Sequence, residues 1–109
     1  MITADYSASP SVRLVGGANS LEGRVEIYYN NTWGTICRNY WDVNAATVLC
    51  RQLGYYGPAG AARFGPGADD QPIWLTKVNC TGEENFITDC SHNPLGLVYC
   101  HHRGDAGVT

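Results

Sequence analysis

The sequence of 109 residues lacks several features that would point to whole classes of function. No run of 18 apolar residues occurs, so no helix of this chain is expected to span a membrane. The seven lysine and arginine residues form no basic stripe and are outnumbered by ten acidic residues, which argues against a nucleic-acid partner. Internal repeats and low-complexity segments are also absent. A chain of this length forms one domain with a small core.

The start of the chain lacks the basic and apolar regions of a signal peptide. It is instead rich in serine, alanine and proline, a composition typical of linkers. We therefore expect residues 1–11 to be a linker or tail and residues 12–109 to form the domain. A module within a longer extracellular protein is the arrangement that this division suggests.

Cysteine is abundant for a chain of this size, with five in 109 residues. Cross-links at this density are typical of small domains in an oxidising compartment. Two glycosylation sequons, which begin at Asn30 and Asn79, favour the same secreted or cell-surface location. The odd count means that at least one cysteine has no partner within the chain.

Alternation and turn residues predict a hairpin early in the chain. A short strand is expected at residues 13–15, followed by two strands at residues 24–29 and 32–37. The strands of this pair are joined by Asn30 and Asn31, which tolerate the positive φ of a tight two-residue turn.

A helix is expected next, capped at its start by Asp42 or Asn44 and stopped by Gly54. Its apolar residues recur at helical spacing and form one buried stripe, made of Ala46, Leu49, Cys50 and Leu53. Cys50 is therefore expected to face the core.

The second half of the chain has weaker signals. Glycine and proline dominate residues 54–72, which are expected to be mostly loop. A buried strand is expected within residues 73–78, and residues 107–109 could form an edge strand. Phe86 and Ile87 are expected to pack under a small loop closed by a disulfide.

Six long motifs occur along the chain in one order: VRLVGG, GRVEIYYNNTWGTIC, WDVNAATVLCRQLG, ARFGPG, PIWLTKVNCTGEENFITDC and CHHRGDAGVT. Together they cover about residues 12–109, and they resemble those of scavenger receptor cysteine-rich domains. The resemblance implies an α+β fold in which a curved antiparallel β-sheet of about six strands cradles one α-helix, stabilised by disulfides.

The resemblance also implies a disulfide pattern. Cysteines of the eight-cysteine group are replaced here by Ser20 and Tyr55, so the chain is similar to the six-cysteine group, group A. The pairing of that group implies the bonds Cys37–Cys100 and Cys80–Cys90. Cys50 would then pair with a cysteine expected directly after Thr109.

A cation site is a further implication of the resemblance. Many family members hold calcium with two adjacent aspartates after the cysteine of the WGT-x-Cys motif, together with a glutamate. The glutamate is present as Glu84, but the aspartate positions look like Arg38 and Asn39. Calcium prefers several carboxylate oxygens, so the usual family site is expected to be impaired here. Calcium binding by the domain stays possible. An ion pair between Arg38 and Glu84 is the competing interpretation.

A second acidic cluster, Asp69 and Asp70, lies in a loop that looks longer than the usual family form. With Glu83, Glu84 or another oxygen donor it is a second candidate metal site. The alternative is a solvated loop tip.

Catalytic groups are missing from the sequence. No serine can be assigned a positioned histidine and aspartate, and no reactive cysteine remains once the implied disulfides are assigned. We expect a non-enzymatic extracellular ligand-recognition module of a scavenger-receptor-like protein. It would bind polyanionic or microbial ligands or a protein partner, and would require no cofactor.

The candidate ligand contacts are residues whose types often carry binding energy at interfaces. They are Arg38, Asn39, Tyr40, Arg63, Lys77 and Glu84. The alternative function is a structural or regulatory spacer within a larger receptor or secreted enzyme. Tyr40 would then pack within the domain instead of meeting a ligand.

Overall fold

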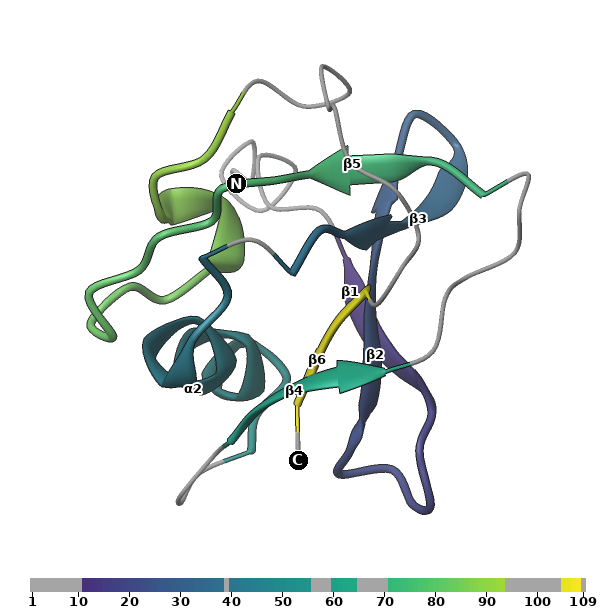
Figure 1. Ribbon diagram of the computed structural model, residues 1–109, viewed down its shortest axis with the longest axis horizontal. Coiled ribbons are helices and arrows are strands. Elements are labelled where there is room, and N and C mark those ends of the chain that lie inside the picture. Colours follow the sequence, from purple (N-terminus) through teal and green to yellow (C-terminus); the bar gives the residue numbers. More distant parts are fainter. Residues whose placement is uncertain (1–10, 39, 56–59, 65–70, 94–104, 109) are drawn as a thin grey trace, which may run out of the picture.

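In the described part of the computed structural model, a six-stranded sheet packs with one α-helix (Figure 1). The structure describes residues 11–38, 40–55, 60–64, 71–93 and 105–108. The elements in these residues are β1 (Val12–Gly16), β2 (Gly23–Tyr29), β3 (Thr32–Ile36), α2 (Val43–Gln52), β4 (Ala61–Phe64), β5 (Ile73–Leu75), the 3-10 helix η1 (Ile87–Asp89) and β6 (Asp105–Val108). None of the described helices is long and apolar enough to cross a membrane.

Strand β2 is the centre of the sheet. The strands follow the order β4-β6-β2-β3-β5, and β1 also pairs with β2. The expected α+β fold is thus confirmed, with one refinement: β3 and β5 pair in parallel, whereas the other pairs are antiparallel. Parallel neighbours need a long crossover connection, and here α2 and β4 lie between the two strands in the chain.

The predicted hairpin forms at the predicted turn. Asn30 and Asn31 have φ of 52° and 63°, the left-handed conformation that a two-residue hairpin turn requires. Tyr29 and Thr32 are the last residues that face each other across the pair. The turn therefore fixes the register of β2 against β3.

Helix α2 begins and ends as its sequence predicts. Of the two candidate caps, the structure uses Asp42, whose side chain accepts a hydrogen bond of 3.0 Å from the Ala45 N–H. Gly54 has φ of 88° and ends the helix. The apolar stripe faces inward, with Leu49 fully buried and Cys50 8% exposed.

The expectation of an edge strand at residues 107–109 is wrong. Strand β6 lies between β4 and β2, and all four of its residues are buried. It becomes interior because β4 covers its outer side, in a region where glycine and proline predicted only loop. Four residues are too few for the alternation of β4 to stand out from its surroundings.

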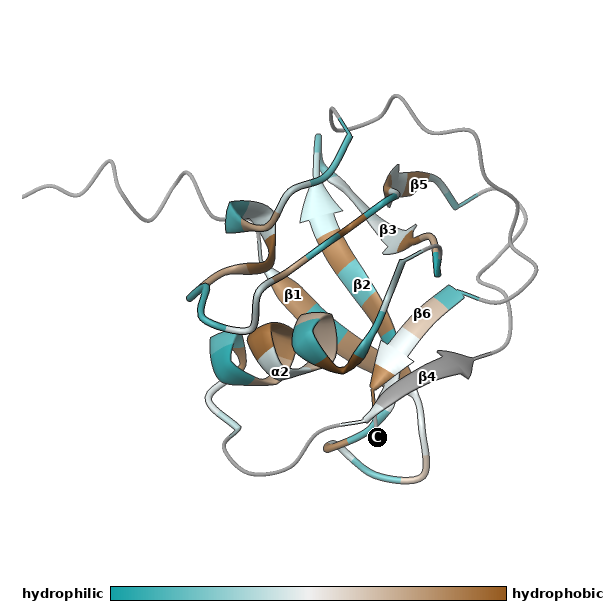
Figure 2. Cartoon of the chain, turned by 60° about the vertical axis from the view of Figure 1, so that its left-hand side comes forward, coloured by the Kyte–Doolittle hydropathy of each residue, from teal (hydrophilic) through white to brown (hydrophobic). Residues whose placement is uncertain are grey.

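The core lies between the sheet and α2, which packs against β4 and β6. Figure 2 shows brown, apolar positions along both β2 and α2. Its fully buried side chains include Val25, Ile27, Ile36, Val48, Leu49, Leu75, Val78, Ile87 and Val108. Ile87 therefore packs inward as expected, whereas Phe86 is 39% exposed, so the expectation for Phe86 is wrong.

The opposite face of β2 holds a buried carboxylate. Alternation places Glu26 away from the core, yet the residue is only 3% exposed. Its two oxygens accept hydrogen bonds from Arg13 at 2.6 and 2.9 Å, from Gln71 at 2.7 Å and from Arg24 at 3.3 Å. Burial by itself would raise the pKa of Glu26, but the hydrogen bonds from Gln71 and Arg13 outweigh it, so the pKa lies below its ordinary value of 4.5.

We expect Glu26→Gln to lower the free energy of unfolding at pH 7 by about 1–3 kcal/mol, because the buried site loses its negative charge and one of its two acceptor oxygens becomes an NH₂ group that faces other donors. Urea denaturation of the variant and the wild type measures the difference. Because the pKa of Glu26 is lower in the folded state than its ordinary value, the ionised carboxylate stabilises the fold above pH 4.5. This contribution is lost as the pH falls through the folded-state pKa. The gap between the two proteins should therefore narrow in acid.

The matched control is Glu22→Gln, since among the described residues that carboxylate accepts one bond, of 3.3 Å, from the exposed Ala18 N–H. Its stability should stay close to that of the wild type. Equal stability of Glu26→Gln and the control at pH 7 would show that the buried network is dispensable.

Candidate functional site

Two exposed basic residues lie where β3 and β5 leave the sheet. The Cys37 N–H donates to the Leu75 carbonyl at 2.8 Å, which continues the parallel pairing one residue past β3. Arg38 and Lys77 follow directly, and both side chains are exposed. Strands β3 and β5 run in parallel and end at the same end of the sheet (Figure 1). The two cations, each two residues past its strand, therefore emerge from that end.

Tyr40 projects from the turn that joins β3 to α2. It is 69% exposed and has φ of 65°. The turn is fixed on both sides, because the Trp41 N–H donates to the Arg38 carbonyl and the Trp41 indole donates to the Gly107 carbonyl, each at 2.9 Å. Lys77 also has a left-handed φ, 57°. Such backbone conformations cost about 1 kcal/mol or more outside glycine and are frequent at functional sites.

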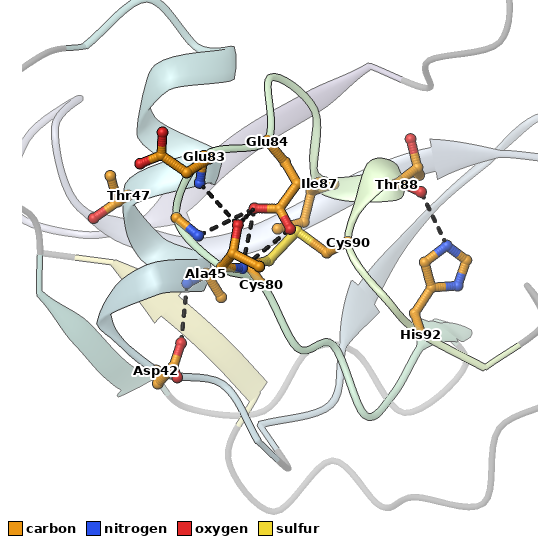
Figure 3. The surroundings of a disulfide bond; sticks show 12 residues. Asp42, Ala45, Thr47, Cys80, Glu83, Glu84, Ile87, Thr88, Cys90 and His92 are labelled. Atoms are coloured by element: carbon orange, nitrogen blue, oxygen red, sulfur yellow. Dashed lines mark hydrogen bonds between the residues drawn. A yellow bond between two sulfur atoms is a disulfide. The ribbon is translucent and has the colours of Figure 1, made fainter.

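Glu84 belongs to a loop closed by the bond between Cys80 and Cys90, whose Cα atoms are 4.8 Å apart (Figure 3). Its carboxylate accepts hydrogen bonds from the Thr81 N–H at 3.0 and 3.1 Å, from the Thr81 hydroxyl at 3.1 Å and from the Gly82 N–H at 3.1 Å. The bond from the Thr81 N–H contributes most to holding the pKa of Glu84 below its ordinary value of 4.5. The carboxylate thus acts as a cap for its own loop.

The same loop is tied to α2 through its backbone. Arg51 on the helix donates to the Glu84 carbonyl at 2.7 Å. Gly82 has φ of 99°, and a Cβ there would lie 3.2 Å from the side-chain oxygen of Asn44. The sequence therefore keeps the loop against the first and last turns of the helix.

The possible metal ligands around Glu84 do not fit calcium. Both carboxylate oxygens already accept hydrogen bonds from the loop, and the resemblance puts the cation Arg38 at one of the two expected aspartate positions. In the described part of the chain, one group of possible ligands converges, namely Cys80, Glu84 and Cys90. Its two sulfur atoms are bonded to each other and so are not available as thiolates.

The ion pair between Arg38 and Glu84, which was the competing interpretation of the cation site, is not formed. The salt bridges among the described residues both involve Glu26, with Arg13 and with Arg24. Glu84 is instead satisfied by donors two and three residues away, which need no long side chain to be ordered. That prediction is therefore wrong.

The cysteines divide into bonded and free. The structure contains the Cys80–Cys90 bond, and Cys37 is also disulfide-bonded. The pairing of Cys37 with Cys100 stays a prediction, because Cys100 lies outside the described residues. Cys50 is free and buried in this chain, and burial raises the pKa of its thiol. A buried thiol with a raised pKa is a poor nucleophile.

The remaining candidate residues are spread over the molecule. Asn30 and Asn79 are exposed, the first at the hairpin turn and the second in a backbone bridge with Ser91. The backbone of Arg63 lies in β4 opposite Ala106, and its side chain is not among those described. Asn39, Asp69 and Asp70 lie outside the described residues. The structure therefore brings Arg38, Tyr40 and Lys77 to one end of the sheet, while Glu84 is committed to its loop.

Sequence reasoning missed the aromatic pairs on the hairpin. The rings of Tyr28 and Trp33 are 5.2 Å apart, and the Arg13 guanidinium lies 4.0 Å from the Trp33 ring centroid. On the other face, Tyr29 contacts Trp74 edge-on at 5.1 Å. The Tyr28–Trp33 pair could have been predicted from the sequence, because a two-residue turn at Asn30 and Asn31 places Tyr28 opposite Trp33.

Comparison with known proteins agrees with this fold. The model of the scavenger receptor cysteine-rich domain matches residues 15–109. The chain belongs to this family. The match covers nearly all of the domain expected at residues 12–109 and includes every element from β2 onward.

Relatives within the family include receptors of macrophages. The chain is 52% identical over 97 residues to the macrophage receptor MARCO of Mus musculus, covering 89% of this chain and 18% of the receptor. It is 48% identical over 102 residues to the macrophage scavenger receptor types I and II of Mus musculus, covering 91% and 22%. The chain thus spans only about a fifth of the length of these curated relatives.

Solved structures of the family share the fold. The third SRCR domain of murine neurotrypsin matches with a TM-score of 0.82 and 47% identity, over 92% of this chain and 94% of that one. The dimeric form of the SRCR domain of mouse MARCO matches with a TM-score of 0.73 and 51% identity, over 88% and 90%.

We expect Glu84→Gln to lower the midpoint of thermal unfolding at neutral pH by several degrees. The amide presents an NH₂ group to a loop that offers only donors, and it carries no charge to strengthen the bonds that remain. Because the folded-state pKa is lowered, the stabilising effect of Glu84 is present above pH 4.5 and is lost as the pH falls below that value. Melting curves between pH 7 and pH 2.5 measure the effect.

Glu83→Gln is the matched control, since the described part of the structure shows no hydrogen bond to that carboxylate. The midpoint of its thermal unfolding should equal that of the wild type throughout the pH range. A Glu84→Gln difference that persists unchanged at pH 2.5 would refute the role assigned to the ionised carboxylate.

Proposed function

We propose that the chain is a non-enzymatic extracellular recognition module. It binds polyanionic ligands, such as the sulfated or phosphorylated polymers of microbial surfaces, at the end of the sheet where β3 and β5 meet. The extracellular location is supported by the disulfide-bonded cysteines, the two exposed sequons and the similarity to macrophage receptors.

The exposed, unpaired cations at this end of the sheet carry the proposal. Arg38 and Lys77 are exposed, and neither makes an ion pair with another described residue. Their charges are therefore available to an anionic ligand even though the chain has a net charge of −3. Tyr40 beside them offers a large exposed side chain on a turn that Trp41 fixes, which lowers the entropy lost on binding.

We further propose that binding does not depend on calcium. A family site of this kind would use a metal ion to meet an anionic group of the ligand. Here Arg38 occupies one of the expected carboxylate positions, and its planar guanidinium forms two parallel hydrogen bonds with sulfate or phosphate directly. Glu84 accepts bonds from its own loop and so is not free to complete a cation site.

A spacer within a larger protein is the second candidate function. The high structural similarity to the third SRCR domain of neurotrypsin supports it, because that domain is one of several in its chain. The aromatic pairs and the buried Glu26 network would then serve only to make the module rigid. Direct binding by the isolated chain separates the two functions.

We expect the isolated chain to bind immobilised dextran sulfate in the presence of EDTA as strongly as in calcium. Affinity should fall steeply between 50 mM and 500 mM sodium chloride, since charges exposed to solvent are screened. Arg38→Ala and Lys77→Ala should each weaken binding roughly fivefold, because each removes one charge-assisted contact. Surface plasmon resonance measures all of these.

Asn31→Asp is the matched control for net charge. It also makes the chain more negative by one unit, but it lies beyond the other end of β3, whose five residues span about 17 Å. It should leave the affinity within about twofold of the wild type. Loss of binding in EDTA would contradict the calcium-independent mode, and absence of binding in every buffer would favour the spacer function.

A further inference from the structure

The hairpin turn places a glycosylation sequon beside an exposed aromatic ring. Asn30 is exposed, and its triplet Asn30-Asn31-Thr32 coincides with the two-residue turn between β2 and β3 (Figure 1). Tyr29 and Thr32 flank the turn and face each other in register, so their side chains project on the same face of the hairpin. The side-chain amide of Asn30, which lies on this turn, is therefore next to the side chains of Tyr29 and Thr32.

The Tyr29 ring is held in place but is not covered. It meets Trp74 edge-on, with ring centroids 5.1 Å apart and planes at 77°. Trp74 is itself fixed, because its indole N–H donates to the Thr32 carbonyl at 3.0 Å. It also lies over Gly34, where a Cβ would be only 2.5 Å from the Trp74 Cδ1. Tyr29 nevertheless keeps 37% of its surface exposed.

We propose that Asn30 is N-glycosylated and that its first N-acetylglucosamine packs on the exposed face of Tyr29, stabilising the hairpin. The C–H bonds of a sugar ring carry partial positive charge, and the face of an aromatic ring is negative. Packing one against the other also removes apolar surface from water. Because Trp74 already orders Tyr29, little side-chain entropy is lost when the sugar binds.

Attachment follows the usual chemistry of secreted proteins. A bond forms between Asn30 Nδ2 and C1 of the sugar, while the bond from C1 to the oxygen of a lipid-linked diphosphate donor breaks. The amide loses one proton, and the lipid diphosphate departs with the bonding electrons. The proposal requires passage through the secretory pathway and is independent of which ligand the domain binds.

The second tyrosine and the second sequon lack this arrangement. Tyr28 points to the opposite face of β2, where it pairs with Trp33 at 5.2 Å. Asn79 precedes the disulfide-bonded Cys80. The hydroxyl of Thr81, the third residue of this sequon, donates to the Glu84 carboxylate at 3.1 Å. Tyr28 and Asn79 therefore serve as internal controls.

The test uses the chain secreted from mammalian cells that make only high-mannose glycans, with Asn79→Gln as the background. Mass spectrometry measures occupancy of Asn30, and endoglycosidase H then leaves a single N-acetylglucosamine. We expect this one sugar to raise the melting temperature by roughly 4 °C or more relative to the same chain made without glycan in bacteria and refolded with its disulfides, which keeps the asparagine that the left-handed turn favours. The increment should survive in Tyr28→Val and fall to less than half in Tyr29→Val.

An NMR measurement covers the case in which Tyr29→Val fails to fold. In the trimmed wild-type protein, the ring current of Tyr29 should shift protons of the Asn30-linked sugar upfield relative to the sugar linked to Asn79. Unoccupied Asn30, equal melting increments in the two tyrosine variants, or identical proton shifts at the two sites would each overturn the proposal.

Discussion

A buried carboxylate on the central strand is the group on which the arrangement of the sheet depends. Removing an ionised Glu26 from water is costly unless donors surround it. Those donors come from β1 through Arg13, from β2 through Arg24 and from the segment before β5 through Gln71, which also reaches the Trp33 carbonyl at 3.3 Å. One charge thus links β1 and β2 to a segment 45 residues further along the chain.

The parallel pairing of β3 and β5 begins beside this link and positions the candidate ligand-binding surface. With Gln71 held at Glu26, the chain enters β5 beside β3, and the two strands end together. Arg38 and Lys77 emerge there because each follows one of these strands. The disulfide loop that carries Glu84 is a separate unit, closed by Cys80–Cys90 and by its own hydrogen bonds. Arg38 and Lys77 are therefore exposed at the end of the sheet, whereas Glu84 accepts hydrogen bonds within its own loop.

Features set by neighbouring residues could be predicted from the sequence, whereas features set by distant ones could not. The hairpin turn and the helix cap at Asp42 depend on local preferences of asparagine and aspartate, and both were predictable. The interior place of β6 depends on β4, a strand too short for its pattern to show. Likewise, Glu26 looked like an outward-facing residue because its partners Arg13 and Gln71 are 13 and 45 positions away.

The most direct test of the account is to map the ligand surface by NMR. A ¹⁵N-labelled sample of the chain would be titrated with a sulfated oligosaccharide in EDTA. We predict that the amide signals of Arg38, Tyr40 and Lys77 shift together, while those of Asn31 and Glu84 stay in place. Shifts that appear only after calcium is added and that centre on Glu84 would contradict the account.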